Sequence, residues 1–231
     1  MKSQVHRGLA GLAMLITPKV AVDVIILTVR DEALQVLFVQ LKPPLYAGVW
    51  AFPGGLVPSG EATEEAAARC LFETTGVKDV YLEQLYTFSN PSRDPHGHVV
   101  SVAYFALVNR RRINLRVPGK CANIGWFPVA SPPPLAYDHA EMLEYARQRL
   151  RWKLEYTNIV YSLLPRDFTL TELQQVYEII LGRPLDKRNF RKKMLNLGML
   201  QVTPRVVKVG AHRPARLYRF RRRMPMMIEV L

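Results

Sequence analysis

Cysteine is nearly absent from this chain of 231 residues, which contains only Cys70 and Cys121. The two do not have the spacing of metal ligands, and so few thiols fit a protein kept in a reducing compartment. Long apolar runs are also missing, because no stretch approaches the roughly 18 apolar residues that a membrane-spanning helix needs. We therefore expect a cytoplasmic protein with no membrane partner.

The N-terminus lacks a complete export signal. Lys2, His6 and Arg7 precede a short apolar run, but no small-residue cleavage site follows it cleanly. Residues 1–17 are therefore predicted to form an N-terminal arm or a short helix.

Acidic residues are scarce, and the scarcity falls on one part of the chain. Residues 1–150 contain 15 Lys and Arg against 13 Asp and Glu, whereas residues 151–231 contain 17 against 6. A nearly neutral first part followed by a strongly basic second part predicts two domains, with the second facing a polyanion. A solvated basic surface is the simpler interpretation, but it does not explain why the excess lies in the last third.

The first domain alternates strands with helices. Its strand-like segments are rich in Val, Ile and aromatic residues and lie at residues 21–29, 34–41, 49–52, 80–88, 99–108 and 123–129. A helix is predicted at residues 62–72, with acidic residues in its first turn and a stop at Gly76. A second helix should begin at Asp138 as its cap and run to about residue 150. This order of elements predicts an α/β sandwich.

Two glycines, Gly54 and Gly55, stand before the first helix, where they suit positive φ or a close backbone approach to a ligand. From Gly55 onward the segment resembles the Nudix hydrolase signature, G-x5-E-x7-R-E-U-x-E-E-x-G-U, in which U is apolar. The matching positions are Gly55, Glu61, Arg69, Leu71, Glu73, Gly76 and Val77. An ordinary amphipathic helix after a Gly-Gly turn is the alternative, but it would not explain so many matches at fixed spacing.

The segment departs from the signature at Cys70 and Thr74. In an active family member, carboxylates at positions 70, 73 and 74 would share one helix face and hold Mg²⁺ against a pyrophosphate. Only Glu73 remains here. The resemblance thus implies a retained Nudix fold in which catalysis is lost and no metal is bound.

The second domain has a different pattern. Residues 151–164 have apolar positions at helical spacing, and Pro165 ends that segment. Thr169 begins a capping box for a helix to residue 181, and Asp186 can cap another helix at residues 187–196. Residues 200–208 and 215–220 then form a plausible β-hairpin. Helices followed by a hairpin are the plan of a winged helix-turn-helix, so the whole chain is predicted to be α+β.

The last helix and the hairpin carry the basic residues that DNA binding requires. Asn and Arg can read base edges by paired hydrogen bonds, while Lys suits phosphates. The helix presents Lys187, Arg188, Asn189, Arg191, Lys192 and Lys193, which should project outward while Phe190 faces the core. The tip of the hairpin offers His212, Arg213 and Arg216, which could contact a minor groove or the DNA backbone. A solvated basic helix is the alternative.

A degenerate Nudix domain joined to a winged helix resembles the Nudix-related transcriptional regulators of NAD metabolism, the NrtR-like regulators. The resemblance extends over nearly the whole chain and is carried by residues 92–95 (SRDP), 101–104 (SVAY), 138–139 (DH) and 185–194 (LDKRNFRKKM). It implies a homodimeric repressor of NAD biosynthesis or salvage genes. The Nudix domain would bind ADP-ribose or a related nucleotide as effector, and a dimer would bind a palindromic operator in double-stranded DNA.

Several residues near the signature are candidates for binding this effector. Trp50 or Phe52 could stack on adenine, although an aromatic residue here could equally be core. Gly55 and Glu73 belong to the signature, and Arg69 could pair with Glu73 and keep the loop shaped. Arg93 is a candidate for contacting a phosphate or a ribose.

Two other functions stay open at this point. The chain could be an ADP-ribose pyrophosphatase whose metal is held by Glu73 with other carboxylates, such as Glu61, Glu64, Glu65 or Glu141. It could also be a Nudix protein that processes RNA. The residues do not decide between release and recruitment of DNA by the effector.

Overall fold

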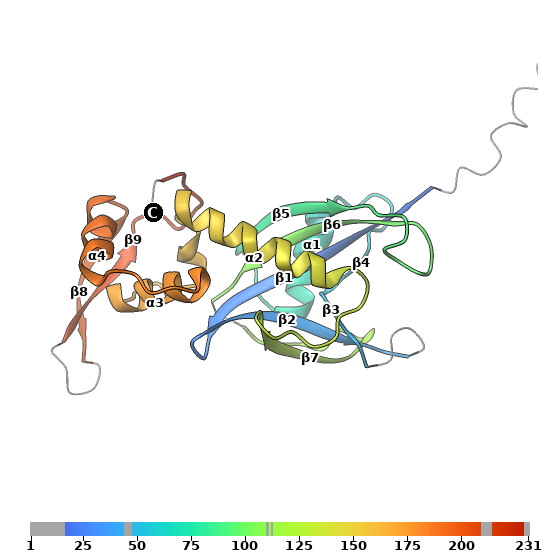
Figure 1. Cartoon of the computed structure of the whole chain (residues 1–231), viewed down its shortest axis with the longest axis horizontal. Coiled ribbons are helices and arrows are strands. Elements are labelled where there is room, and N and C mark those ends of the chain that lie inside the picture. Colours follow the sequence, from blue (N-terminus) through green and yellow to red (C-terminus); the bar gives the residue numbers. More distant parts are fainter. Residues whose placement is uncertain (1–16, 44–47, 110, 112, 209–213, 229–231) are drawn as a thin grey trace, which may run out of the picture.

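The computed structural model describes residues 17–43, 48–109, 111, 113–208 and 214–228. A mixed sheet flanked by two helices forms one end of the elongated molecule, and smaller helices with a hairpin form the other (Figure 1). Within the described residues, no helix is long and apolar enough to cross a membrane. The predicted N-terminal arm lies outside the described residues, apart from its last position.

The sheet has the central order β3-β2-β1-β6-β5, with β4 paired to β1 and β7 paired to β2. Its strands are β1 (Lys19–Arg30), β2 (Ala33–Leu41), β3 (Trp50–Ala51), β4 (Gly54–Leu56), β5 (Tyr81–Phe88), β6 (Val99–Leu107) and β7 (Cys121–Pro128). Only the pairing of β1 with β6 is parallel. Each predicted strand is present, and β4 is an additional short one.

Helix α1 (Thr63–Thr75) and helix α2 (His139–Tyr156) cover opposite faces of the sheet. Side chains of a strand point alternately to its two faces. On β1, Val24 packs in the cluster that contains Ala66 and Ala67 of α1. Its neighbour Ile25 packs in the cluster that contains Met142 of α2. The apolar run of β1 is continuous because both faces are covered, and the predicted sandwich is confirmed.

The signature helix has the predicted position and continues to Thr75, directly before the predicted stop at Gly76. Its N-terminus is closed by Glu65, whose carboxylate accepts a hydrogen bond from the backbone N–H of Ala62 at 3.1 Å. Gly76 ends the helix with φ of 68°, the left-handed conformation that glycine adopts without strain. The predicted stop is therefore correct.

Helix α2 differs from the prediction of two helices that meet at residue 150. It is one helix of 18 residues, followed by the short 3-10 helix η2 (Ile159–Ser162). Its buried face includes Met142, Ala146, Leu150 and Leu154, which lie four residues apart and therefore on one side. Trp152, one of the apolar residues at helical spacing in the segment 151–164, lies on the other side and is 50% exposed.

The second part of the chain forms a winged helix. It contains α3 (Leu170–Leu181), α4 (Lys187–Asn196) and the hairpin of β8 (Leu200–Val207) with β9 (Ala215–Phe220). The predicted caps are confirmed, since Thr169 Oγ1 accepts from the Glu172 N–H at 3.1 Å and Asp186 accepts from the Asn189 N–H at 2.7 Å. The 3-10 helix η2 takes the place of the predicted first helix.

The two parts share one hydrophobic core. Val36 of β2, Leu150 of α2 and Val176 of α3 belong to the same cluster of buried residues. Asn109, which follows β6, donates a buried hydrogen bond from Nδ2 to the Leu163 carbonyl at 2.8 Å. Helix α2 runs along the molecule from the sheet toward the winged helix (Figure 1), so a single rigid element connects the two ends.

Candidate functional site

A cavity of about 240 Å³ opens beside the glycine pair, between β1, β4, α1 and the start of α2. Its polar lining comes from segments far apart in the sequence. These residues include Asp23, Glu73, Thr74, Arg93, Asp94, Lys120, Tyr137 and His139. Apolar residues of β1, β2 and β4 complete the walls, as is usual for a site that binds a small molecule.

The glycine pair shapes one wall of the cavity. A Cβ on Gly54 would lie 2.3 Å from the Val22 carbonyl oxygen and 2.6 Å from Asp23 Oδ1, because β4 pairs closely with β1. Gly55 has φ of 156°, and a Cβ there would lie 2.8 Å from Lys120 Nζ. Close approach requires glycine at the first position, as the sequence predicts.

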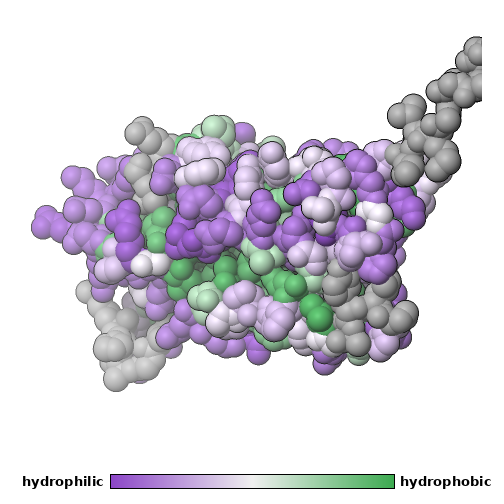
Figure 2. Space-filling view, turned by 45° about the vertical axis from the view of Figure 1, so that its right-hand side comes forward, coloured by the Kyte–Doolittle hydropathy of each residue, from purple (hydrophilic) through white to green (hydrophobic). Residues whose placement is uncertain are grey.

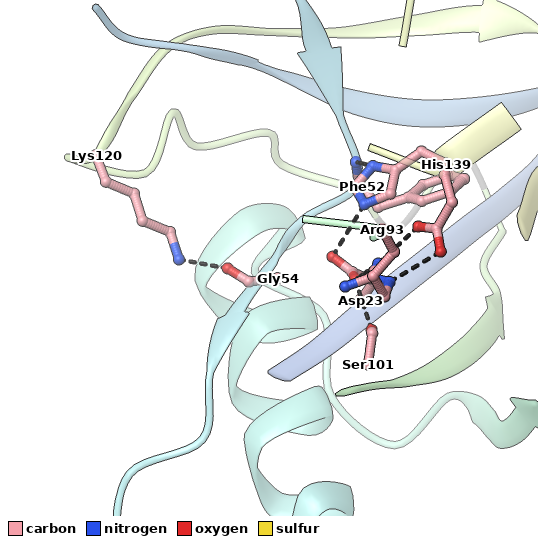
Figure 3. A network of polar contacts seen from close by, with 8 residues as sticks. Asp23, Phe52, Gly54, Arg93, Ser101, Lys120 and His139 are labelled. Carbon is pink, nitrogen blue, oxygen red and sulfur yellow. Dashed lines mark hydrogen bonds and ion pairs between the residues drawn. The ribbon is translucent and has the colours of Figure 1, made fainter. Parts of the chain in front are cut away.

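A buried network of charged groups lies next to the glycine pair and forms another part of the cavity wall (Figure 3). Arg93 donates from Nε and Nη2 to both carboxylate oxygens of Asp138, at 2.8 and 2.7 Å. Its Nη2 also lies 3.6 Å from Asp23 Oδ2. Ser101 donates from Oγ to the same oxygen of Asp23 at 2.6 Å. These contacts hold β1, β6, the loop after β5 and the start of α2 together.

Asp138 therefore has a different role from the one predicted. It stands at the N-cap position of α2, but its side chain accepts no capping hydrogen bond. The carboxylate instead makes two parallel hydrogen bonds to the charged guanidinium of Arg93, where a cap would give bonds to neutral backbone N–H groups. The prediction that Asp138 caps the helix is wrong.

Asp23 and His139 face each other inside this wall. His139 accepts at Nδ1 from the Phe52 backbone N–H at 3.0 Å, so its remaining proton is on Nε2, which lies 3.5 Å from Asp23 Oδ1. Burial acts to raise the pKa of the Asp23 carboxyl, but His139, Ser101 and Arg93 together hold it below its usual value. Asp23 is thus a buried carboxylate rather than a proton donor.

The face of α1 that carries metal ligands in the signature is mostly neutral here. Cys70 and Thr74 are buried, and Thr74 Oγ1 donates back to the Cys70 carbonyl at 2.5 Å. Glu73 lines the cavity with a side chain that is 50% exposed. A hard divalent cation prefers several carboxylate oxygens, and the described residues contain no group of three or more His, Cys, Asp or Glu that could hold a metal.

The carboxylates proposed for a metal site in the enzyme alternative have other positions. Glu61 accepts two hydrogen bonds from Arg69, at 2.8 and 2.7 Å, and Glu65 bonds the start of α1. Glu64 and Glu141 are exposed and lie outside the cavity lining. The predicted pairing of Arg69 with Glu73 is present at 3.5 Å, but Glu61 is the closer partner.

The structure brings four of the six predicted effector residues to the cavity, namely Phe52, Gly55, Glu73 and Arg93. Phe52 is only 3% exposed and packs on Phe38 and His139, so its ring has little free face for stacking on adenine. Trp50 packs edge-on against Phe127, with ring centroids 4.6 Å apart, and does not line the cavity. Arg69 lies outside the lining as well.

Asp23, His139 and Lys120 are among the cavity residues that the sequence prediction does not include. Asp23 is the one charged residue within the apolar run of β1, and such an isolated charge could have indicated a functional position. His139 is the first residue of α2, where the sequence suggests only a helix start. Lys120 lies in an irregular segment, and no local pattern places it beside the glycine pair.

The predicted recognition helix α4 presents its basic residues at the end of the molecule (Figure 1), which is hydrophilic in Figure 2. Lys187, Arg188, Asn189 and Lys192 are exposed, and Phe190 is buried as expected. The prediction that Arg191 projects freely outward is wrong, because its Nη2 donates to Thr171 Oγ1 at 2.9 Å and its side chain is only partly exposed.

The remaining predicted DNA-binding residues are only partly described. Lys193, also on α4, is half-buried rather than fully outward. Arg216 is exposed on β9, at the tip end of the hairpin. His212 and Arg213 lie outside the described residues.

Comparison with known proteins gives both parts a family. Residues 17–146 match the model of the Nudix domain, and residues 160–220 match that of the NrtR DNA-binding winged helix domain. Over 208 residues the chain is 39% identical to an Acinetobacter baylyi protein named ADPR responsive transcriptional repressor NtrR, covering 88% of this chain and 82% of that protein. Over 147 residues it is 33% identical to an ADP-ribose pyrophosphatase from Methanocaldococcus jannaschii, covering 64% of this chain and 82% of that protein.

Solved structures agree with this assignment. NrtR from Shewanella oneidensis, in a crystal with a 27mer DNA, has a TM-score of 0.79 at 35% identity, covering 87% of this chain and 93% of that one. The Nudix domain of the same protein, crystallised with ADP ribose, has a TM-score of 0.53 at 36% identity, covering 58% and 89%. The chain therefore belongs to the Nudix family and, through its winged helix and the match over most of its length, to the NrtR group of transcriptional regulators.

Proposed function

We propose that this protein is a transcriptional repressor that binds operator DNA through α4 and the hairpin and binds ADP-ribose or a related nucleotide in the cavity. The observation that carries this proposal is the pairing of two features in one chain. A Nudix cavity keeps its glycine wall but has only one of the three carboxylates at positions 70, 73 and 74, and α2 connects it to a basic winged helix. We place the boundary between the effector-binding domain and the DNA-binding domain within α2.

Loss of hydrolysis follows from the chemistry of α1. Cleaving a pyrophosphate with metal help requires carboxylates that fix the cation against the phosphates. With a thiol at position 70 and a hydroxyl at position 74, a bound nucleotide would stay intact. A ligand that binds without being consumed suits a sensor, because its occupancy then reports its concentration.

The targets and the assembly are part of the same proposal. We propose that the repressor controls genes for NAD biosynthesis or salvage, as the resemblance to the NrtR-like regulators implies. We further propose a homodimer, which would bind a palindromic operator with half-sites about 34 Å apart. The test is a gel shift with the promoter next to its own gene, with and without ADP-ribose. DNA binding that is weaker in the presence of ADP-ribose supports the proposal. DNA binding that is the same with and without ADP-ribose contradicts it.

The second candidate is an ADP-ribose pyrophosphatase. Its support is the similarity to the Methanocaldococcus jannaschii enzyme and the exposed Glu73 in the cavity. Incubating the pure protein with ADP-ribose and Mg²⁺ or Mn²⁺ distinguishes the pyrophosphatase from the repressor that only binds the nucleotide. Turnover near the ~10 per second that is typical of enzymes would favour the pyrophosphatase, whereas tight binding without products would favour the sensor.

The exposed start of α4 gives a specific prediction for DNA binding. Replacing Arg188 or Asn189 with alanine should cost about 1–3 kcal/mol on the operator and relax base preference, because these side chains suit base edges. Replacing Lys193 should weaken binding to all sequences and reduce the salt dependence, because lysine suits phosphates. Equal losses on operator and random DNA for Arg188→Ala would contradict base reading.

A further inference from the structure

The cavity contains two side chains with a permanent positive charge among its described lining, Arg93 and Lys120. A nucleotide diphosphate carries at least two negative charges, and without a metal ion these charges need a protein cation. The phosphates of the ligand should therefore bind at whichever of these two cations does not already pair with a carboxylate of the protein. The sequence favours Arg93, but the geometry does not.

The guanidinium of Arg93 is already committed to protein carboxylates. Its side chain is 3% exposed, it makes two hydrogen bonds to Asp138, and it lies 3.6 Å from Asp23. A phosphate at this position would have to displace a buried carboxylate, and it would also meet the negative charge of the other one. Arg93 is thus a positioning residue, which fixes the start of α2 against β1.

Lys120 is in the opposite situation. It is exposed, and its Nζ donates to the backbone carbonyl of Gly54, a neutral acceptor. No carboxylate among the described residues lies within ion-pair distance of it. In Figure 3 it reaches Gly54 from the side away from Arg93. A ligand phosphate could replace a carbonyl contact without breaking an ion pair.

The surroundings of Lys120 fit an anion site. Gly55 leaves open the space beside its ammonium, because a Cβ there would lie 2.8 Å away. The turn that carries it is closed by the Cys121 N–H, which donates to the Pro118 carbonyl at 2.8 Å. Cys70, at the position where the signature has a carboxylate, lines the same cavity as Lys120.

From these contacts we propose that Lys120, with the Gly54–Gly55 backbone, forms the anion subsite that binds the pyrophosphate of the effector. A glutamate at position 70 would neutralise this ammonium, whereas the thiol leaves its charge available. With a thiol at position 70, the site lacks a metal-binding carboxylate, and the charge of Lys120 stays available to the ligand. This inference rests on the proposed function and names the part of the site that contacts the diphosphate.

The test is calorimetric titration of the full chain, in EDTA, with ADP-ribose, adenosine and inorganic pyrophosphate. Lys120→Met should weaken ADP-ribose by about 10- to 100-fold, the range for a hydrogen bond to a charged group, and should abolish pyrophosphate binding. Adenosine affinity should stay within about threefold of the unmodified protein, since it has no phosphate. Lys120→Arg should recover most of the ADP-ribose affinity.

Lys42 provides a matched control. It is an exposed lysine that donates to the neighbouring Gly119 carbonyl at 2.7 Å but lies outside the cavity lining. Lys42→Met removes the same charge from the same region and should change ADP-ribose affinity by less than about threefold. Equal losses of ADP-ribose affinity in the two variants would mean that only the overall positive charge of this region matters, and the proposal would be overturned.

The outcomes also separate this inference from the proposed function. ADP-ribose binding that is unchanged in Lys120→Met would overturn the subsite and leave the sensor intact. Pyrophosphate binding that depends on Lys120, in a protein that does not bind ADP-ribose, would support the subsite and overturn ADP-ribose as the effector. Binding of neither ligand by the unmodified protein would overturn both.

Discussion

Arg93→Met should lower the melting temperature of this protein by about 6–20 °C, the largest effect expected of any single charge removal here. Removing one partner of a buried ion pair costs about 3–5 kcal/mol, and each kcal/mol shifts the transition by about 2–4 °C in a chain of this size. The reason is that Asp138 and Asp23 would both stay buried without a cation. Thermal unfolding followed by circular dichroism measures the shift.

Arg69 is the control for this prediction. It makes a bidentate pair of similar geometry with Glu61, but its side chain is 42% exposed. Water can replace the lost partner there, so Arg69→Met should cause a much smaller shift. Adding Asp138→Asn to Arg93→Met should recover part of the stability, because it removes one of the uncompensated charges. Equal shifts in melting temperature for Arg93→Met and Arg69→Met would show that the burial of the Arg93 network does not determine how much it stabilises the protein.

Gly54→Ala should also destabilise the fold strongly, by about 3 kcal/mol, the upper end of the usual cost of overpacking. The added Cβ would lie 2.3 Å from the Val22 carbonyl oxygen and 2.6 Å from Asp23 Oδ1. Backbone cannot move away without breaking the pairing of β4 with β1, so the strand itself must shift. The measurement is the midpoint of urea unfolding, and ADP-ribose binding should weaken in parallel because the cavity wall moves.

Gly119→Ala is the matched substitution. It changes the glycine that precedes Lys120, where an added Cβ would meet no atom within 4 Å. The same chemical change should therefore leave the unfolding midpoint nearly unchanged, or raise it slightly by restricting the unfolded chain. A loss at Gly119 as large as that at Gly54 would contradict the steric explanation.

Local chemistry made most of the winged helix predictable. The α4 bounds agree with the prediction because Asp186 supplies a cap whose effect depends only on residues close to it in the sequence. The same is true of Thr169 and Glu172 at the start of α3. Segments rich in Val, Ile and aromatic residues likewise predict the strands, since helices cover both faces of the sheet and favour nearly continuous apolar runs.

Contacts between distant residues could not be predicted in this way. Asp138 has the sequence of a helix cap, and only the arrival of Arg93 from a loop 45 positions earlier gives it another partner. The break expected at residue 150 is absent because Leu150 and Leu154 continue the buried face of α2 into the second part. Lys120 and Asp23 meet the cavity through strand pairing, which the local sequence does not encode.

The continuity of α2 has a mechanical consequence. At a rise of 1.5 Å per residue, its 18 residues form a rod about 27 Å long. His139 lines the cavity at one end of the rod, and Leu154 lies in the core shared with the winged helix at the other. A pivot of about ten degrees at the first turn would swing the far end by about 5 Å, more than the ~3.4 Å between successive base pairs. In the proposed repressor, a small displacement at the cavity would thus be enlarged along α2 until α4 no longer matched the spacing of the bases.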